Sequence, residues 1–430
     1  MAPVKKQCSR SSGQRGAVAV VVALSALVLF GFAGIAIDVG RLYINRTELQ
    51  TAADACALAA SAELTCDPAG GTCPASFLLN AQAAGIYAAG RNNRDFQVNP
   101  VVVATADVKF YTALAPNANY LSIAGGASNN SRYVMCTARA TGIAPWFMGV
   151  FGTGGQTVTS AGVATRAPAS SFCNAAPIGL CAKPGGYVVG EWITGNFTSN
   201  GSGEDTTGSF RWVDFTPGGG GTNEARDQFV GNAGVCNIRV GDTVALPGVH
   251  QGIKSAYNTR FGIYPNGANA YTPSTAPPDR TGYAYPNKAP GSPVISIPAG
   301  TPPIGNAYAD YRRRQGLNTS TDTPFIDNQY GVTGPGGNIP GNPDTTLGDY
   351  VALGSDRRLV AAPIIDCTAG SPTIAGMACV LMLNPMSNGA TGTIYLEYRG
   401  LATAAGSPCR VGGLSGGAAS TGPQVPTLVQ

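Results

Sequence analysis

The fold is decided by residues 15–43, RGAVAVVVALSALVLFGFAGIAIDVGRLY. Within this stretch Ala17 to Ile37 form an uncharged run, which as a helix at ~1.5 Å per residue spans ~31 Å and matches the hydrocarbon core of a bilayer. A cleaved secretory signal has an apolar core of only about 7–15 residues. The run therefore predicts a transmembrane helix that stays attached to the chain. Small Gly34 and Ala36 leave cleavage after Ala36 as the alternative.

Positive charge is concentrated before this run. Lys5, Lys6, Arg10 and Arg15 precede every acidic residue, and the whole chain has a formal net charge of +4. Positive residues stay on the cytoplasmic side, so residues 1–16 are expected to form a cytoplasmic tail, with everything after Asp38 outside. The rest of the chain is electrically neutral, which argues against a nucleic-acid partner.

Helix-favouring residues continue beyond the membrane run, and we expect one transmembrane and stalk helix over residues 17–64. Its small residues Ala19 and Ala23, then Gly31 and Gly34, would let another helix approach closely. Helix packing with other membrane proteins, or between copies of this chain, is one interpretation of this pattern. The other is an ordinary anchor whose Ala-rich stalk packs on its own domain.

Residues 14–62 combine three features: the membrane run, the exit sequence Asp38-Val39-Gly40-Arg41, and the Ala-rich segment ELQTAADACALAAS. This combination resembles the N-terminal signature of the TadE/TadG family of tight-adherence (Tad) pilus-assembly proteins, in its TadG-like branch. The resemblance implies a protein of the bacterial inner membrane with a periplasmic C-terminal part. It would help to build a Flp-type pilus and contact other pilus-assembly membrane proteins or pilin.

Two features of that family do not carry over to this chain. Pseudopilin members have Glu five positions after the processing-site Gly, whereas here Gly16 is followed by Val21. The metal site of a von Willebrand type A domain needs Asp-x-Ser-x-Ser after an apolar strand. Its nearest approach, from Asp205 to Ser209, follows polar sequence, so we expect no such site.

The remaining sequence predicts an α+β fold whose outer part is Gly/Pro-rich and mostly antiparallel β. Residues 65–168 indicate a small α+β unit with a second helix ending at Gly90. Residues 172–410 indicate a β-rich ectodomain with long loops at 265–349, and we expect residues 411–430 to be a flexible tail. Three closing strands, RRLVAAPIIDC, MACVLML and a half-exposed TIYLEYRG, should form an antiparallel meander.

Ten of the eleven cysteines follow the membrane run, which fits an oxidising compartment. Three pairs are close in sequence and could close short disulfide loops: Cys66 with Cys73, Cys173 with Cys181, and Cys367 with Cys379. The remaining Cys56, Cys136, Cys236 and Cys409 would pair at long range or stay free. Zinc is disfavoured because the chain has no Cys-x-x-Cys pair and a single His.

We expect no catalytic, cofactor-binding or metal-binding residues. Ser415 fits a Gly-x-Ser-x-Gly pattern, but no Asp, Glu or His follows it to complete a triad. Arg312 to Arg314 form a basic run that is expected in a solvated loop. Two other functions remain open. One is a surface adhesin that binds glycans or host proteins through the 265–349 loops, and the other is a tethered periplasmic hydrolase that uses His250.

Overall fold

The structure is a computed structural model of the 430-residue chain. It describes the following residues: 15–66, 73, 76–198, 207–216, 221–231, 235–246, 251–264, 271–282, 284–285, 307–314, 353–354, 356–386, 391–416 and 420–429. The expected cytoplasmic tail up to residue 14, most of the 265–349 loops and His250 lie outside this set.

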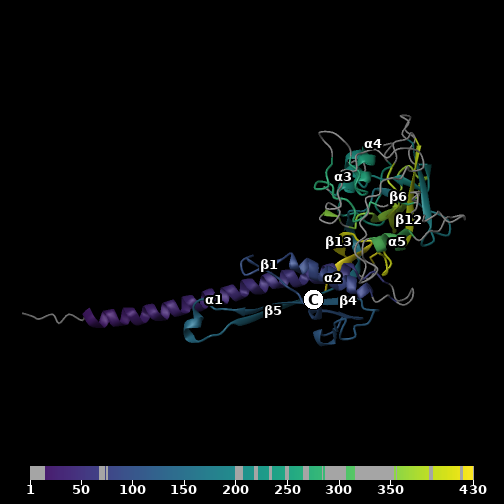
Figure 1. The fold of residues 1–430 in the computed structure, drawn as a ribbon. Helices are drawn as coiled ribbons and strands as arrows, with labels where there is room; N and C mark the ends of the chain where they lie inside the picture. The colour runs from purple at the N-terminus through teal and green to yellow at the C-terminus, as the bar shows by residue number, and fades with distance from the viewer. Residues whose placement is uncertain are drawn as a thin grey trace, which may run out of the picture.

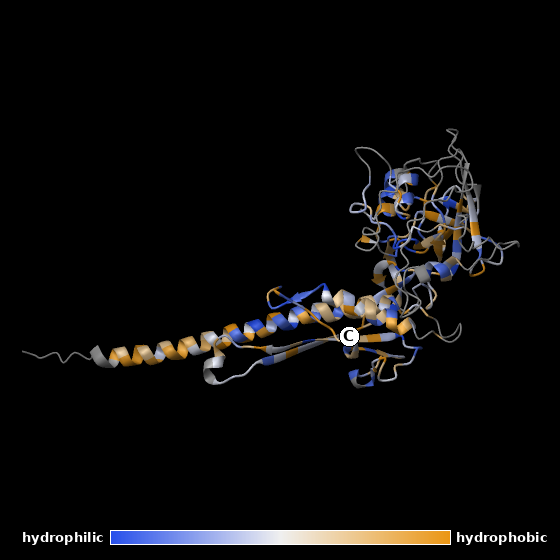
Figure 2. Ribbon diagram, viewed as in Figure 1, coloured by the Kyte–Doolittle hydropathy of each residue, from blue (hydrophilic) through white to orange (hydrophobic). Residues whose placement is uncertain are grey.

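The described part of the chain begins with a single helix of 48 residues, α1 (Arg15–Ala62). Its first half projects alone, with large apolar side chains such as Leu27 and Phe30 about 70% exposed, whereas Ala52, Ala53 and Ala57 in its second half are fully buried. Figure 2 shows this change as a continuous apolar segment that gives way to mixed polarity. Among the described residues α1 is the one helix long and apolar enough to cross a membrane, and it fits a single-pass anchor.

The second half of α1 covers a small antiparallel sheet. The sheet has the order β13-β5-β4-β3, and β14 also pairs with β5. Its strands are β3 (Val108–Tyr111), β4 (Tyr133–Ile143), β5 (Gln156–Cys173), β13 (Gly412–Ser415) and β14 (Gln424–Leu428). The expectation that residues 411–430 form a flexible tail is therefore wrong, because strands from this segment complete the sheet along β5.

Small residues allow α1 to lie very close to its neighbours. The second helix, α2 (Ser76–Gly90), crosses α1 at Gly85, where a Cβ atom would come within 3.0 Å of the Cys56 backbone. On the sheet side a Cβ at Gly162 of β5 would come within 2.4 Å of the Asp54 carboxylate. The Ala-rich stripe of the stalk is thus used for packing within the chain, in one core with Val108, Val134 and other sheet residues.

Short elements complete this part of the molecule. They are the paired strands β1 (Asn93–Arg94) and β2 (Asn99–Pro100), and the 3-10 turns η2 (Thr105–Asp107), η3 (Asn117–Asn119) and η4 (Met148–Phe151). The turn η4 lies at the tip of the hairpin that joins β4 to β5.

The ectodomain is built on a seven-stranded sheet with the order β8-β7-β12-β11-β10-β6-β9. Its strands are β6 (Ile178–Cys181), β7 (Trp192–Thr198), β8 (Thr207–Gly208), β9 (Phe210–Trp212), β10 (Leu359–Ile365), β11 (Ile374–Met382) and β12 (Thr391–Leu401). All neighbours pair antiparallel except β6 with β10, and β10, β11 and β12 form the expected meander.

Both faces of this sheet are covered. Helices α3 (Gly221–Val230) and α4 (Gln251–Thr259) pack on the face that presents Ile394 and Leu396. The opposite face is covered in part by α5 (Ala307–Arg314), which lies within the stretch expected to be loop. The expectation that β12 is half exposed is wrong. Glu397 on its second face is fully buried and accepts hydrogen bonds from Trp192 Nε1 and the Tyr308 amide, because α5 covers this face of the strand.

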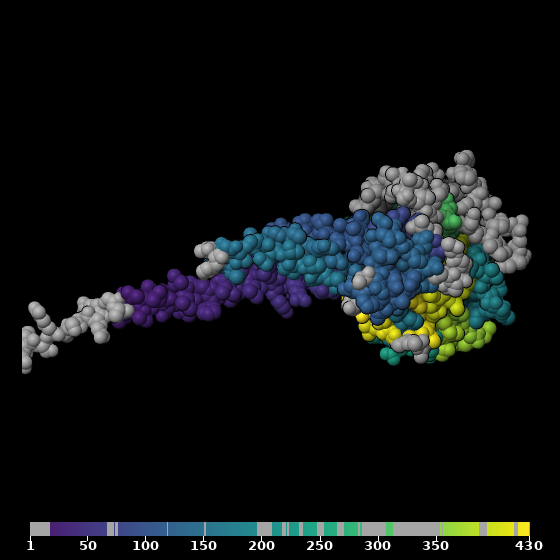
Figure 3. Space-filling view, turned by 90° about the horizontal axis from the view of Figure 1, so that it is seen from below, coloured from purple at the N-terminus to yellow at the C-terminus, as the bar shows by residue number. Residues whose placement is uncertain are grey.

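The two parts of the molecule are joined by β5, which starts beside the middle of α1 and ends in the ectodomain. Its Phe172 bridges to Ile238 and lies in the ectodomain core. The boundary expected near residue 168 therefore falls inside a continuous strand. Figure 1 shows the resulting shape, with the β4–β5 hairpin running back along α1 and the ectodomain at the far end. Figure 3 shows the hairpin lying directly against the helix.

Five disulfides lie among the described residues. They are Cys56–Cys136, Cys66–Cys73, Cys173–Cys236, Cys181–Cys367 and Cys379–Cys409. The expected loop from Cys66 to Cys73 is present. Pairing of Cys173 with Cys181 and of Cys367 with Cys379 is wrong. The first two cysteines end different strands, and Cys181 lies beside Cys367 because β6 pairs with β10.

Candidate functional site

The long helix is fastened to the rest of the chain at two places. We call the first the exit junction, formed by Asp38, Arg41, Asp95 and the hairpin tip at residues 144–153. It lies where the apolar run ends. The second, the body junction, is formed around Glu63 near the other end of the helix.

Asp38 holds the hairpin tip at the exit junction. Its carboxylate accepts hydrogen bonds from three consecutive backbone amides, those of Trp146 at 2.8 Å, Phe147 at 3.0 Å and Met148 at 2.7 Å. Burial acts to raise the pKa of Asp38, but these three donors outweigh it, and the pKa lies below its ordinary value. The side chain therefore stays charged at neutral pH and fixes the backbone at the start of η4 to the helix.

Arg41, one turn further along, ties two loops to the helix. Its Nε and Nη2 each lie 2.8 Å from an oxygen of Asp95, a two-point pairing, and its Nη1 donates to the Ala144 carbonyl at 2.8 Å. The guanidinium also lies 4.5 Å from the centre of the Trp146 ring. The hydrogen bond from Arg41 holds the pKa of Asp95 below its ordinary value. A planar fork can make all these contacts together, which a lysine could not.

The backbone around Asp95 is shaped for this contact. Asp95, Phe96 and Gln97 all have positive φ, a costly conformation for residues with a side chain. Asn45 donates to Asp95 at 3.4 Å and to the Arg41 carbonyl at 3.0 Å. Strain of this kind persists where the surroundings over-determine it. Here the surroundings are Arg41 and Asn45 of the helix, which both hydrogen-bond to Asp95.

Gly34 receives the aromatic ring of the hairpin tip. A Cβ atom at this position would lie 2.7 Å from the Cβ of Phe147, so no larger residue fits without displacing the tip. Gly31, one turn earlier, has open space around it. A groove of about 550 Å³ runs along this face between the helix and Phe147 and Met148, and reaches Ala23.

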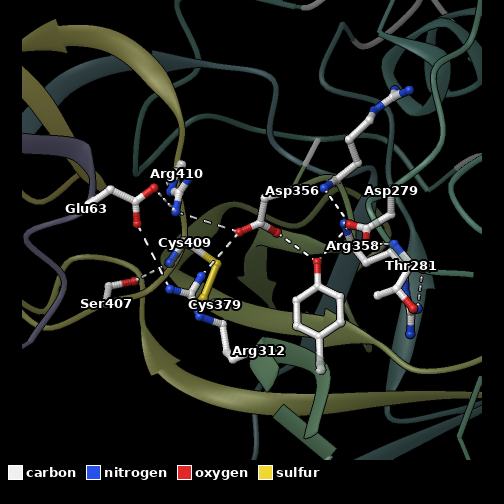
Figure 4. Close-up of polar contacts among 12 residues, drawn as sticks. Glu63, Asp279, Thr281, Arg312, Asp356, Arg358, Cys379, Ser407, Cys409 and Arg410 are labelled. Carbon is white, nitrogen blue, oxygen red and sulfur yellow. Dashed lines mark hydrogen bonds and ion pairs between the residues drawn. A yellow bond between two sulfur atoms is a disulfide. The ribbon is translucent and has the colours of Figure 1, made fainter. Parts of the chain in front are cut away.

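The body junction is a buried cluster of charges (Figure 4). Arg410 lies 2.7 Å from one oxygen of Glu63 and 3.9 Å from Asp356. Arg312, on α5, lies 3.7 Å from Asp356 and 4.0 Å from Glu63. Two cations and two carboxylates thus alternate between the end of the stalk and the ectodomain. The expectation of a solvated Arg312 is wrong, since its side chain is only 10% exposed.

Neighbouring groups hold this cluster rigid. The Tyr311 hydroxyl lies between Asp279 and Asp356, at hydrogen-bonding distances of 2.7 Å and 2.8 Å from one oxygen of each. Arg166 of β5 donates to the Ser407 and Cys409 carbonyls at 2.8 Å and 3.0 Å. Burial, together with repulsion from Arg410, lowers the pKa of Arg166 to about 10, which leaves it charged at neutral pH.

These junctions are suited to mechanical coupling. Among the residues that the structure describes, no group of three or more His, Cys, Asp or Glu side chains could hold a metal ion. Among these described residues, the charged groups of both junctions contact oppositely charged side chains or backbone groups of the same chain. Such contacts hold parts of a protein together. Ser415 of the Gly-x-Ser-x-Gly pattern pairs with Ala169 within the sheet.

The residues expected to pack against other helices have different surroundings. Ala19 and Ala23 are exposed, and Gly31 is partly exposed. Gly34 is buried under Phe147 of the same chain, so this position is not free for a partner helix. Asp38 and Arg41 were visible in the sequence as an exit motif, but their partners were not. Glu63 and Arg410 gave no signal, because isolated charges next to turns usually face solvent.

Comparison with known protein families gives a match to the part of the chain that contains α1. The family Tad, described as Flp pilus-assembly TadE/G-like, matches residues 16–63. This match supports membership of the TadE/TadG family. The Tad segment covers the apolar half of α1, the exit junction residues Asp38 and Arg41, and the stalk as far as Glu63. No curated protein and no solved structure matches the chain.

Proposed function

We propose that this chain is a membrane-anchored, non-enzymatic accessory protein for assembly of a Flp-type pilus in the bacterial inner membrane. The N-terminus lies in the cytoplasm, the apolar half of α1 crosses the bilayer, and the ectodomain lies in the periplasm. The observation that carries the proposal is the match to the Tad family over residues 16–63, which is the part of the chain that forms the helix and contributes Asp38, Arg41 and Glu63 to its two junctions.

The structure suggests how such a protein works. The two junctions make α1, the small sheet and the ectodomain one continuous body, so the ectodomain keeps a fixed distance and direction from the membrane. The exposed apolar half of α1 remains available to other pilus-assembly membrane proteins or to a second copy of the chain. Its small residues Ala19, Ala23 and Gly31 would let a partner helix approach closely.

The test is complementation of a deletion strain with the variant Ala23→Leu/Gly31→Leu. We expect fewer surface pili and weaker co-purification with the other pilus-assembly membrane proteins, because two bulky side chains close the small face. Val18→Leu/Val22→Leu, at two exposed apolar positions on the opposite face of the helix, is the matched control. Full piliation in Ala23→Leu/Gly31→Leu would contradict the role of the small face. Protease shaving of intact cells that removes the ectodomain would instead indicate a surface adhesin.

A further inference from the structure

The hairpin tip contacts α1 at a residue that comes before the end of the apolar run. The expected membrane run ends at Ile37, and Phe147 packs on Gly34, three residues earlier. At ~1.5 Å per residue this contact lies ~5 Å inside the end of the run. The groove beside it extends further, to Phe30 and Leu27. If α1 is inserted in the bilayer up to Ile37, the contact between Phe147 and Gly34 therefore lies within the depth of the membrane.

Several polar backbone groups of the tip have partners within the protein. Asp38 accepts from the amides of residues 146–148, and Arg41 donates to the Ala144 carbonyl. Within the tip the Gly152 amide donates to the Gly149 carbonyl at 3.0 Å, and the Thr153 amide to the Met148 carbonyl at 3.3 Å. Non-helical backbone is tolerated at membrane depth when its donors and acceptors have partners within the protein. The exit junction supplies those partners.

The described side chains of the tip include exposed apolar groups. Residues 144–153 read APWFMGVFGT and contain no charge. Trp146 is 55% exposed and Phe147 is 47% exposed, and exposed apolar groups that adjoin one another mark a contact surface. The ring of Phe96 stacks on Trp146, with ring centres 6.2 Å apart. Aromatic residues gather at membrane–water interfaces, where a flat, partly polar ring is well accommodated.

We infer that the β4–β5 hairpin tip is a second membrane-contacting element, which inserts Trp146, Phe147 and Met148 into the outer leaflet beside α1. The occupant of this surface is lipid, because the tip continues the exposed apolar surface of the membrane run without a break. Asp38 and Arg41 mark the depth at which the protein meets the headgroups. The helix would then be held at two points, which limits its tilt and rotation in the bilayer.

This inference rests on the membrane insertion contained in the proposed function, and the test separates the two. The purified full-length chain is reconstituted into phosphatidylcholine vesicles and floated on a density gradient. Tryptophan emission of the floated fraction is then compared between vesicles with and without lipids brominated near the headgroup end of their acyl chains. The variant Trp146→Phe keeps an aromatic ring but removes the tryptophan emission at this position. The difference between the two proteins therefore reports on Trp146, since Trp192 and Trp212 are buried in the ectodomain.

We expect brominated lipid to quench the wild-type emission and to leave Trp146→Phe unchanged. The quenched share should not exceed the contribution of one of the three tryptophans. Quenching should weaken when the bromines are moved towards the bilayer centre.

If the protein fails to float, the anchoring and the tip contact both fail. If it floats and the two proteins respond equally to bromine, only the tip contact is overturned. Unquenched Trp146 together with cross-linked dimers would show that a second copy covers the groove. A double variant, Trp146→Ser/Phe147→Ser, should float normally yet be extracted at a lower detergent concentration, and unchanged extraction would also count against the inference.

Discussion

Asp38 has an unusual position for a carboxylate, since it directly follows a long apolar run. The charge is retained because three amide donors replace the water that the group loses. Arg41 uses the opposite chemistry on the next turn and binds Asp95 and a carbonyl of the hairpin. The Asp-Val-Gly-Arg exit sequence thus has a structural explanation, because both charged residues fasten the hairpin to the helix and Arg41 also fastens the Asp95 loop.

Acidification should loosen the exit junction. The pKa values of Asp38 and Asp95 lie below their ordinary value of 3.8 in the folded chain, so both stabilise the fold above about pH 4. This contribution is lost as the pH falls through the folded-state values. We expect the midpoint of thermal unfolding to fall more steeply with acid in the wild type than in Asp95→Asn. Equal slopes between about pH 5 and about pH 2 would contradict this role.

Gly34 and Gly31 provide a matched pair for testing the contact with the hairpin tip. Gly34→Ala places a methyl group on Phe147, and overpacking of this kind costs about 1–3 kcal/mol. Gly31→Ala meets open space and gains helix propensity. Hydrogen exchange of the amides at residues 146–148 should therefore accelerate in the first variant and not in the second. The same exchange rates in both would show that Phe147 does not rest on Gly34.

The disulfide Cys56–Cys136, which links α1 to β4, should contribute more to the free energy of unfolding of the helix-bearing part than Cys66–Cys73 does. Cys56–Cys136 closes a loop of 80 residues, whereas Cys66–Cys73 closes a loop of 7. On the chain-entropy account, replacing both cysteines of the first pair by Ala costs about 4 kcal/mol, against about 2 kcal/mol for the second. Urea unfolding of the two double variants measures the difference. A larger loss from the short loop would contradict it.

The elements themselves were largely predictable from the sequence. The length of α1, the end of α2 at Gly90 and the β10–β12 meander follow from local patterns that these residues satisfy in place. The helix α5 was not predictable, because its sequence AYADYRRR has few apolar residues and it is stabilised by charges distant in the chain. Strands β13 and β14 were missed for a related reason, since the Gly-rich sequence of β13 and the Pro-containing sequence of β14 form strands by pairing with β5, which is distant in the chain.

The exit and body junctions together explain why stalk and ectodomain form one body, and the body junction can be tested directly. Glu63→Gln keeps the shape of the side chain but removes the charge that Arg410 faces at 2.7 Å. Weakening one partner of a buried ion pair should cost roughly 2–4 kcal/mol. We expect a lower midpoint of urea unfolding and a broader distribution of overall dimensions in small-angle X-ray scattering.

The matched control for the body junction is Arg139→Gln. Its ion pair with Asp107 is solvent-exposed, with the arginine side chain 53% accessible, and exposed pairs contribute at most about 1 kcal/mol. If both variants behave alike, the body junction is not what aligns the ectodomain with the helix. The partners in this junction could not be predicted from sequence, because Glu63, Arg312 and Arg410 meet only after the whole chain has folded.

The late pairing of β14 has a consequence for how the protein is made. Strand β5 emerges early in translation, yet Val425 of β14 must reach it, and Val425 also enters the ectodomain core. The helix-bearing sheet therefore cannot be finished while the ribosome is still delivering the ectodomain. Under the proposed topology, export through the membrane would leave this early strand without its last partner, and a stalled or clipped polypeptide would expose its open edge to quality-control proteases.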